Sequence, residues 1–371
     1  MIDEVKFDHI SIIGLGLLGG SIAKTARKLG IVKKVTGCGR NDSRLEYAVN
    51  NGIADKVTKN PVDAVKGADL VFICTPVGTI PGIIENISGY LNPGCIVSDV
   101  GSTKQEIVEK AESCLPRNVN FIGCHPMAGS EESGIEAATD CLFENAICVL
   151  TSSEKTNITA LNKLSNLWET FKSRVMILTP EEHDHLVAAS SHLPHMVAVS
   201  LVNCISDIAE ENDKVLPLLA GGFRDTTRIA SGSSEMWMDI CRENKDYIIP
   251  LIDKYISSLK EISCVISENS DDKLLKRFVI AKEFRDELPE KGKGVLDSDN
   301  EIIVDVADRP GVIGEITCAL GKEGINIRNI NVRHVRELSG GTLSLIIEKS
   351  EDMEKAVSIL EGSGLKAKIR N

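Results

Sequence analysis

The sequence predicts a parallel α/β domain of the Rossmann-like kind, then an all-helical domain, then a small α+β domain of the ferredoxin-like kind. Short apolar runs alternate with helix-forming segments through the first half, and helical periodicity dominates the middle. The last part reads strand, helix, strand, strand, helix, strand. We therefore expect domains at residues 1–178, 179–288 and 301–371, with a charged, glycine-bearing linker at 289–300.

The charge and the cysteine pattern restrict the class of protein. The chain has 42 Lys and Arg against 54 Asp and Glu, a net charge of -12, which argues against nucleic acid or a membrane surface as a partner. Its 11 cysteines are scattered singly. With no signal peptide or 18-residue apolar run recognised, these features favour a reduced, cytoplasmic protein.

A glycine pattern follows the first expected strand. Gly14, Gly16 and Gly19 form G-x-G-x-x-G, and a helix-forming run at 21–29 follows; Leu17, within the pattern, is a further candidate for cofactor binding. The bare pattern is weak, but an apolar strand before it and a helix after it are typical of a dinucleotide-binding loop. The second glycine would let the backbone approach a pyrophosphate at the helix N-terminus.

Ligands of such sheets lie beyond the carboxyl ends of the strands, which selects the candidates for the site. Thr75 and Pro76 follow the "ADLVFIC" strand, and Ser102 follows "GCIVSDV". His125 ends the expected strand at 118–126, so we expect it on the face where a nicotinamide would lie.

The second strand bears on the choice of cofactor. NAD sites place an acid about twenty residues past the glycines, where this chain has Gly39 and then Arg40. The missing acid and the arginine favour NADP. Asp42 is close enough to leave NAD open.

The helical region begins with a specific start signal, in which Thr179 is the N-cap and Glu182 closes a capping box. At 100° per residue, His185, His192 and His195 should share one face and His183 should point elsewhere. Pro194 should kink or interrupt the helix between His192 and His195. Without H-E-x-x-H or a cysteine ligand, we expect no metal.

Farther along the helical region, Arg228 is either a clamp for an anion or a partner for Asp225. The long amphipathic helices that follow provide enough apolar surface for a core or for a homodimer interface.

The C-terminal module has its own candidate ligand site. Asp308, Pro310 and Gly311 belong to a "DRPG" turn ahead of a helix, which can leave backbone N–H groups free for a carboxylate. Asn326 and Asn329 supply polar side chains nearby, and Gly340-Gly341 marks a hairpin. A plain β-turn in a structural module is the alternative.

Taken together, the motifs resemble those of prephenate dehydrogenases that carry a C-terminal ACT regulatory domain. The resemblance runs through "GLGLLGGS", "SDVGSTK", "GCHPMAGSEESG", "SSHLPH" and "GGFRDTTRIA", and then "DRPGVIGEIT" and "GINIRNI". It implies oxidative decarboxylation of prephenate with hydride transfer to NAD or NADP, in tyrosine biosynthesis. It also implies a dimer through the helical domain and feedback inhibition by tyrosine through the ACT domain.

The resemblance also implies roles for single residues. His125 would be the catalytic histidine and Ser102 its partner. His192 and His195 would bind the substrate, Arg228 would take its ring carboxylate, and Glu131 is the acid after the catalytic loop.

Three other functions stay open from the sequence. Arogenate dehydrogenase needs an acid near the substrate's ammonium group, and Glu131 or Asp225 could serve. A β-hydroxyacid dehydrogenase normally uses a lysine in the helical domain, where this chain has histidines. A non-catalytic amino-acid sensor would not need Ser102, His125 and Arg228 beside an intact glycine loop.

Overall fold

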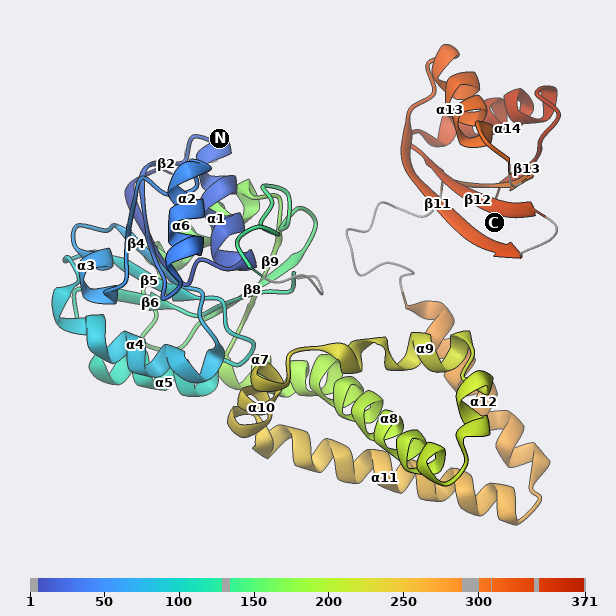
Figure 1. Cartoon of the computed structure of the whole chain (residues 1–371), viewed down its shortest axis with the longest axis horizontal. Coiled ribbons are helices and arrows are strands. Elements are labelled where there is room, and N and C mark those ends of the chain that lie inside the picture. The colour runs from blue at the N-terminus through green and yellow to red at the C-terminus, as the bar shows by residue number, and fades with distance from the viewer. Residues whose placement is uncertain (1–5, 129–133, 289–299, 308, 337–339, 370–371) are drawn as a thin grey trace. The chain divides into compact units, whose positions relative to one another are not determined.

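The computed structural model describes residues 6–128, 134–288, 300–307, 309–336 and 340–369 (Figure 1). Contacts divide the chain into two compact units, Met1–Leu288 and Pro289–Asn371. The expected linker at 289–299 lies outside the described residues. The expected division at residue 178 falls inside the first unit and stays a prediction.

The first unit contains a six-stranded sheet in the order β3-β2-β1-β4-β5-β6, and all its neighbouring pairs are parallel. This order reverses at β1 and β4, which is the arrangement of a doubly wound dinucleotide-binding fold. Its strands are β1 (Phe7–Ile13), β2 (Val32–Cys38), β3 (Lys56–Thr58), β4 (Leu70–Ile73), β5 (Ile96–Asp99) and β6 (Asn120–Ile122). The expected α/β architecture is confirmed.

Helices connect these strands and bury both faces of the sheet (Figure 1). The connecting helices are α1 (Leu17–Lys28), α2 (Asp42–Asn50), α3 (Pro61–Val65), α4 (Ile80–Ile87) and α5 (Gln105–Cys114), whereas α6 (Ile158–Thr170) comes after the last strand of this sheet and packs against β6. One apolar cluster includes Phe72 and Trp168, whose rings meet edge to face at 6.0 Å. The second cluster lies on the other face and includes Ile73 and Ile107.

The expected strand at 118–126 is wrong in one respect, because it breaks at Gly123. Its second part, β7 (Cys124–Pro126), joins another sheet in the order β7-β8-β9 with β8 (Ile147–Thr151) and β9 (Arg174–Leu178). A Cβ at Gly123 would lie 2.3 Å from Thr151 Oγ1, so the crossing of the strands requires glycine. His125 therefore stands on a strand that pairs antiparallel with β8.

The helical region begins with the expected capping box, since Thr179 Oγ1 accepts from Glu182 N and Glu182 Oε2 accepts from Thr179 N. Its elements are α7 (Pro180–Val187), a π-helical turn (Ala188–His192), α8 (Leu193–Glu211), α9 (Gly221–Thr227), α10 (Ser234–Glu243), α11 (Lys245–Ser267) and α12 (Asp271–Glu287). The expected helical domain is confirmed.

Pro194 does not interrupt the helix as expected, because it occupies the first turn of α8 directly after the π-helical turn. A proline removes the N–H that would bond four residues back, and a π turn absorbs such a lost bond. Helix α7, the π turn and α8 therefore form one run, Pro180–Glu211.

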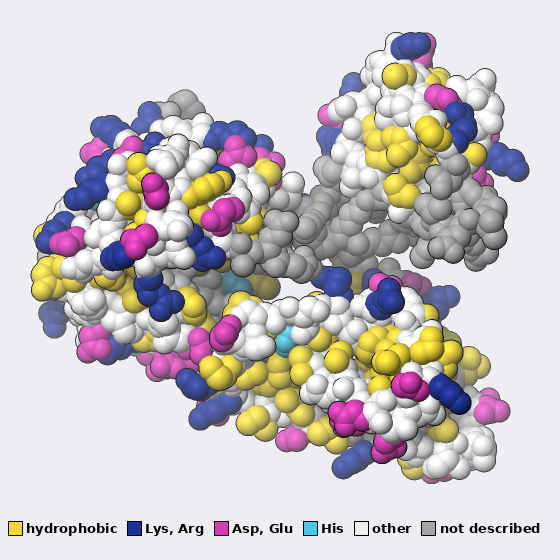
Figure 2. Space-filling view, in the orientation of Figure 1, with side chains coloured by type: hydrophobic (Ala, Val, Ile, Leu, Met, Phe, Trp, Pro, Cys, Tyr) yellow, Lys and Arg dark blue, Asp and Glu magenta, His cyan; other side chains and the backbone are white. Residues whose placement is uncertain are grey.

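This run is long and apolar enough, by length and composition, to cross a membrane, so the expectation of no 18-residue apolar run was wrong. Only 28% of its most apolar window is buried within the chain. Exposed apolar side chains are frequent over the whole helical region (Figure 2). Buried polar residues of the candidate site also lie on this run, which does not suit a lipid-facing helix.

The second unit has the expected ferredoxin-like order, with strands β11-β12-β10-β13 in one sheet. Its elements are β10 (Glu301–Val306), α13 (Val312–Lys322), β11 (Ile327–Arg336), β12 (Gly340–Ile347), α14 (Met353–Gly362) and β13 (Lys366–Ile369). β11 and β12 pair antiparallel, as the expected hairpin requires. The unit has a separate core that includes Ile316, Leu345 and Leu360.

Candidate active site

The glycine loop between β1 and α1 has the shape that a dinucleotide needs. Gly14 has φ +104°, and a Cβ there would lie 2.5 Å from Cys74 O. A Cβ at Gly19 would lie 2.2 Å from Gly14 O, so both positions require glycine. Gly16 faces open space and is the N-cap of α1, with no side-chain cap, and Leu17 opens the helix. The first-turn N–H groups of α1 are thus available to a phosphate.

The other expected cofactor residues follow neighbouring strands at the same edge of the sheet. Arg40 is exposed just after β2, and no described residue pairs with it. Asp42 forms an ion pair with Lys59 at 2.7 Å. Thr75 and Pro76 follow β4, and Thr75 Oγ1 accepts a hydrogen bond from Thr79. These residues fit a dinucleotide laid across the carboxyl ends of the strands.

His125 is the centre of a hydrogen-bonded chain of three side chains. Its Nδ1 lies 2.8 Å from Nε2 of His183, whose Nδ1 lies 2.7 Å from Oδ1 of Asp184. Asp184 also accepts from Lys104 N at 2.7 Å and from Gln105 N at 2.9 Å. The Asp184 carboxylate thereby caps α5 and orients His183 at the same time.

The sequence interpretation of the histidine face was wrong for two residues. His183 is fully buried in the site, whereas His185 is exposed and lies near Tyr247. The π-helical turn is the reason, because it takes up one extra residue. In a regular helix, the twelve residues from His183 to His195 would rotate the side-chain direction by about 120°. Because the π turn accommodates one of them without further rotation, the two side chains differ in direction by only about 20°. The capping box predicted where α7 begins but not the π-helical turn that follows it.

A buried ion pair spans the loop after β5 that carries Ser102, a candidate catalytic residue. Lys104 Nζ contacts Asp99 Oδ2, and both side chains are fully buried. Asp99 also accepts from Gly101 N at 2.7 Å and from Cys124 N at 3.2 Å. These bonds fix the loop after β5, which bears Ser102, next to β7, which bears His125. Removing either partner would leave a buried charge unpaired.

His192 and His195 lie together against one aromatic ring. His195 stacks on Trp237 at 3.5 Å with an interplanar angle of 9°, and His192 meets the same ring edge-on at 5.9 Å. His192 Nδ1 also lies 3.0 Å from Nδ2 of Asn244. His195 Nδ1 is buried and has no hydrogen-bond partner among the described residues.

The remaining expected residues, Ser102, Arg228 and Glu131, have fewer contacts or lie outside the described residues. Ser102 is half-buried and makes no hydrogen bond with a described residue, while its neighbour Thr103 donates to Glu243 Oε2 at 2.6 Å. Arg228 is exposed at the start of the short helix Arg228–Ser231, which packs on α8, and it makes an interaction of its own. Glu131 lies outside the described residues.

Burial keeps the histidines of the site neutral. It lowers the pKa of His125 well below the ordinary value, with nearby His183 and Lys104 acting in the same direction. Burial also lowers the pKa of His183, against the opposing effect of its hydrogen bond to Asp184, and lowers the pKa of His192 to about 4. Neutral imidazoles can accept a proton, which is what an alcohol oxidation requires.

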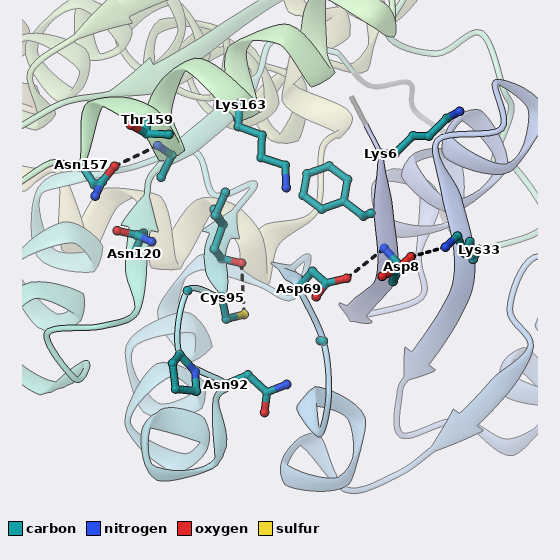
Figure 3. A pocket seen from close by; sticks show the side chains of 16 residues that line it. Lys6, Asp8, Lys33, Asp69, Asn92, Cys95, Asn120, Asn157, Thr159 and Lys163 are labelled. Atoms are coloured by element: carbon teal, nitrogen blue, oxygen red, sulfur yellow. Dashed lines mark hydrogen bonds and ion pairs between the residues drawn. The ribbon is translucent and has the colours of Figure 1, made fainter. Parts of the chain in front are cut away.

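Two further observations concern a cavity outside the candidate site and the metal-ligating side chains. A cavity of about 730 Å³ lies at the opposite, amino-terminal edge of the sheet, where Lys6, Asp8, Asp69 and Lys163 line it (Figure 3). It holds none of the residues expected to be catalytic. No cluster of metal-ligating side chains occurs among the described residues.

The expected effector residues lie in the second unit. Pro310 and Gly311 precede α13, and Gly311 has φ +89° as its N-cap. Asn326 Nδ2 donates to Glu348 Oε2 at 2.7 Å, and Asn329 is half-buried in β11. Asp308 lies outside the described residues.

Three family models match the chain in succession. Residues 22–187 match the prephenate dehydrogenase nucleotide-binding domain, residues 179–279 match the prephenate dehydrogenase dimerization domain, and residues 300–362 match the ACT domain.

Known proteins match it over long stretches. The chain is 38% identical to prephenate dehydrogenase of Bacillus subtilis, over 95% of this chain and 96% of that one. A crystal structure of Aquifex aeolicus prephenate dehydrogenase with hydroxyphenyl propionate and NAD+ matches with a TM-score of 0.72 and 33% identity, over 76% of this chain and 98% of that one. Synechocystis arogenate dehydrogenase matches with a TM-score of 0.66 and 31% identity, over 75% and 99%.

Proposed function

Because this chain belongs to the prephenate dehydrogenase family and is an NAD(P)-dependent oxidoreductase, we propose that it oxidises prephenate itself, with His125 as the proton acceptor. The product is 4-hydroxyphenylpyruvate, which places the enzyme in tyrosine biosynthesis. The observation that supports this proposal most strongly is the hydrogen-bonded chain from His125 through His183 to Asp184.

That chain determines which nitrogen of His125 is free. The Asp184 carboxylate accepts from two backbone N–H groups. An ionised carboxylate can only accept, so the hydrogen in its contact with His183 is on Nδ1 of His183. In neutral His183, Nε2 then carries no hydrogen and must accept from His125 Nδ1. His125 Nε2 is left unprotonated, and it is the atom that can take the proton of a substrate hydroxyl.

The reaction balances with this one base. The hydroxyl proton goes to His125 Nε2 as a hydride leaves the same ring carbon; a nicotinamide bound at the glycine loop would supply the acceptor for that hydride. The bond between the ring and its carboxylate then breaks to release carbon dioxide, and its electron pair makes the ring aromatic. The proton on His125 returns to the ring oxygen, and the Asp184 carboxylate stabilises the transient imidazolium through His183.

The other residues orient the dianionic substrate. We assign Ser102 to the reacting hydroxyl, because its loop is held beside β7 by the Asp99–Lys104 pair. His192 and His195 bind the substrate from α8, and Arg228 offers a planar fork to the ring carboxylate. Glu131 is proposed as a substrate-binding residue from the family motif.

The decisive experiment is nicotinamide reduction by the purified protein with prephenate and arogenate, each tried with NAD and NADP. Turnover with prephenate is expected. Turnover with arogenate alone would refute prephenate as the substrate, and the direct product would then be tyrosine. The match to an arogenate dehydrogenase makes this the second candidate.

The cofactor ratio tests a separate proposal, a preference for NADP. Arg40 is exposed and unpaired among the described residues, so it can meet a 2′-phosphate, whereas Asp42 is occupied by Lys59. Replacing Arg40 by Asp should then raise KM for NADP and leave KM for NAD less affected. A wild-type enzyme that prefers NAD would refute this proposal.

We further propose that tyrosine inhibits the enzyme through the ACT domain, at the turn around Pro310 and Gly311 with Asn326, Asn329 and Asp308. Inhibition of the full chain by tyrosine and its loss after truncation at residue 288 are expected. The Aquifex aeolicus match, which spans 98% of that protein within 76% of this chain, supports a catalytic part that folds alone. A full-length enzyme that tyrosine does not inhibit would contradict the proposal.

We also propose that the enzyme is located in the cytoplasm.

A further inference from the structure

Asn244 lies between two groups of the site, although no sequence pattern pointed to it. It is 1% exposed and follows α10 directly, at the junction with α11. Its Nδ2 lies 2.9 Å from the carbonyl oxygen of Asp184 and 3.0 Å from Nδ1 of His192. Its Oδ1 is buried and has no partner among the described residues.

The contact with Asp184 determines how the amide is oriented. A carbonyl oxygen can only accept, so the group that faces it must be the NH2 end of Asn244. A flipped amide would place two oxygens against each other. One hydrogen of Nδ2 thus goes to Asp184 O, and the other points at His192 Nδ1.

The orientation of the amide then determines the tautomer of His192. Nδ1 must accept the hydrogen from Asn244, so the ring hydrogen of neutral His192 is on Nε2. An imidazolium would place two donors against each other at this contact. We propose that Asn244 is a positioning residue that holds His192 as the neutral Nε2–H tautomer, so that His192 offers the substrate an uncharged hydrogen-bond donor.

This inference rests on the proposed function, in which His192 touches the substrate. The titratable groups around His192 come from three elements. Asp184 and His183 on α7 act in opposite directions, His195 on α8 disfavours the charged form, and His125 on β7 is close enough to interact. Burial dominates and lowers the pKa of His192 to about 4. Substrate binding through His192 is therefore independent of pH between 6 and 8.

The test replaces Asn244 by Asp, which has the same shape but accepts at both oxygens. In Asn244→Asp, His192 gains an acceptor at Nδ1, and its pKa rises. Below that pKa the imidazolium still donates from Nε2, whereas above it the neutral ring keeps its hydrogen on Nδ1. The oxygen that replaces Nδ2 at the Asp184 carbonyl affects KM equally at all pH values, so the comparison is made within the variant. Its KM for prephenate should rise by about tenfold or more from pH 6 to pH 8, the usual cost of a lost hydrogen bond to a charged group.

A purely structural role would raise KM to the same extent at every pH, and that result would overturn the proposal. The matched control is Asn203→Asp on the exposed side of α8, which should leave KM unchanged at both pH values. The KM of the wild-type enzyme for prephenate should be the same at pH 6 and pH 8.

A second measurement does not depend on how the variant folds. Nitrogen-15 spectra of histidine-labelled full-length protein, with His192→Gln to assign the resonance, report which ring nitrogen carries the hydrogen. Hydrogen on Nε2 is expected, and hydrogen on Nδ1 would refute the proposal. If the wild type oxidises neither prephenate nor arogenate, the proposed function fails, whereas the spectra still decide the tautomer.

Discussion

At the residue scale, the proposed site is a set of imidazoles whose hydrogen positions follow from the groups that they contact. Asp184 orients His183, which orients His125. The main-chain oxygen of Asp184 orients Asn244, which orients His192. One aspartate thereby leaves His125 with a free acceptor nitrogen and His192 with a donor nitrogen. The two histidines present opposite hydrogen-bonding groups because their partners differ.

Replacing His183 by Phe should lower kcat by roughly 100-fold, the usual contribution of a positioned general base. The phenyl ring preserves the buried packing but gives His125 Nδ1–H no acceptor, so the tautomer with a free Nε2 is no longer favoured. Steady-state kinetics with prephenate measure the effect. His185→Gln, on the same helix but exposed, is the control and should retain full activity. A His183→Phe enzyme with normal kcat would refute the relay.

The buried histidines also make stability depend on pH. His125, His183 and His192 have lowered pKa values in the folded protein, so below about pH 6.5 the unfolded chain binds protons that the folded chain does not. The free energy of unfolding should therefore be constant above pH 7 and fall as the pH drops below 6.5. Urea unfolding at pH 5.5 and 7.5 measures this. In a His192→Gln variant the fall should be smaller, and an equal fall would contradict the assignment.

At the element scale, the π-helical turn at Ala188–His192 sets the site, because it changes the phase between α7 and α8. Each residue of a helix advances the direction of its side chain by about 100°. His183 on α7 and His195 on α8 reach the same side only because the turn holds one extra residue. Similar turns often occur at functional sites of other proteins.

Deleting Ala189, an exposed residue of that turn, should convert the run into a regular helix and rotate α7 away from α8. Activity should fall at least as far as in His183→Phe, while the helical signal in circular dichroism stays unchanged. Ala189→Ser keeps the length of the turn and should keep its activity. An active deletion variant would show that the extra residue is not needed.

At the scale of the whole molecule, large apolar side chains of the helical region are exposed in the part of the chain that the structure describes. Leu275, Phe278 and Phe284 on α12 are each at least 60% exposed. The matching family model for this part is named a dimerization domain. A second copy of the chain is the cover that we expect, and it would also shield the apolar run that includes α8.

If the chain forms the homodimer that we expect, the double replacement Phe278→Asp with Phe284→Asp should convert it into a 40.2 kDa monomer. Burying a phenyl side chain contributes about 2 kcal/mol, so losing two should raise the dissociation constant by about 1,000-fold or more. Sedimentation velocity measures the mass. Lys282→Asp on the same helix is the control and should remain dimeric. A dimeric double variant would place the interface elsewhere.

The sequence by itself determined the order of the domains and the glycine loop, because these depend on local spacing. Gly14, Gly16 and Gly19 meet a backbone requirement that any chain entering this turn must satisfy. The carboxyl ends of parallel strands share one edge, which selected Thr75 and Ser102 without coordinates. The strand-to-helix alternation was likewise enough for the ferredoxin-like unit.

Only the tertiary structure decided which side chains act on His125. Helical periodicity selected His185 and rejected His183, since an extra residue in a π turn leaves no mark that a period of 3.6 can show. The sequence pattern placed Gly123 inside one strand. In the structure that strand ends at Gly123, which lies close to Thr151, and its two parts belong to different sheets. Asn244 is 60 residues from Asp184 along the chain, and their contact forms only when α7 and the junction of α10 with α11 come together in the fold. Long-range packing of this kind is not visible in any local pattern.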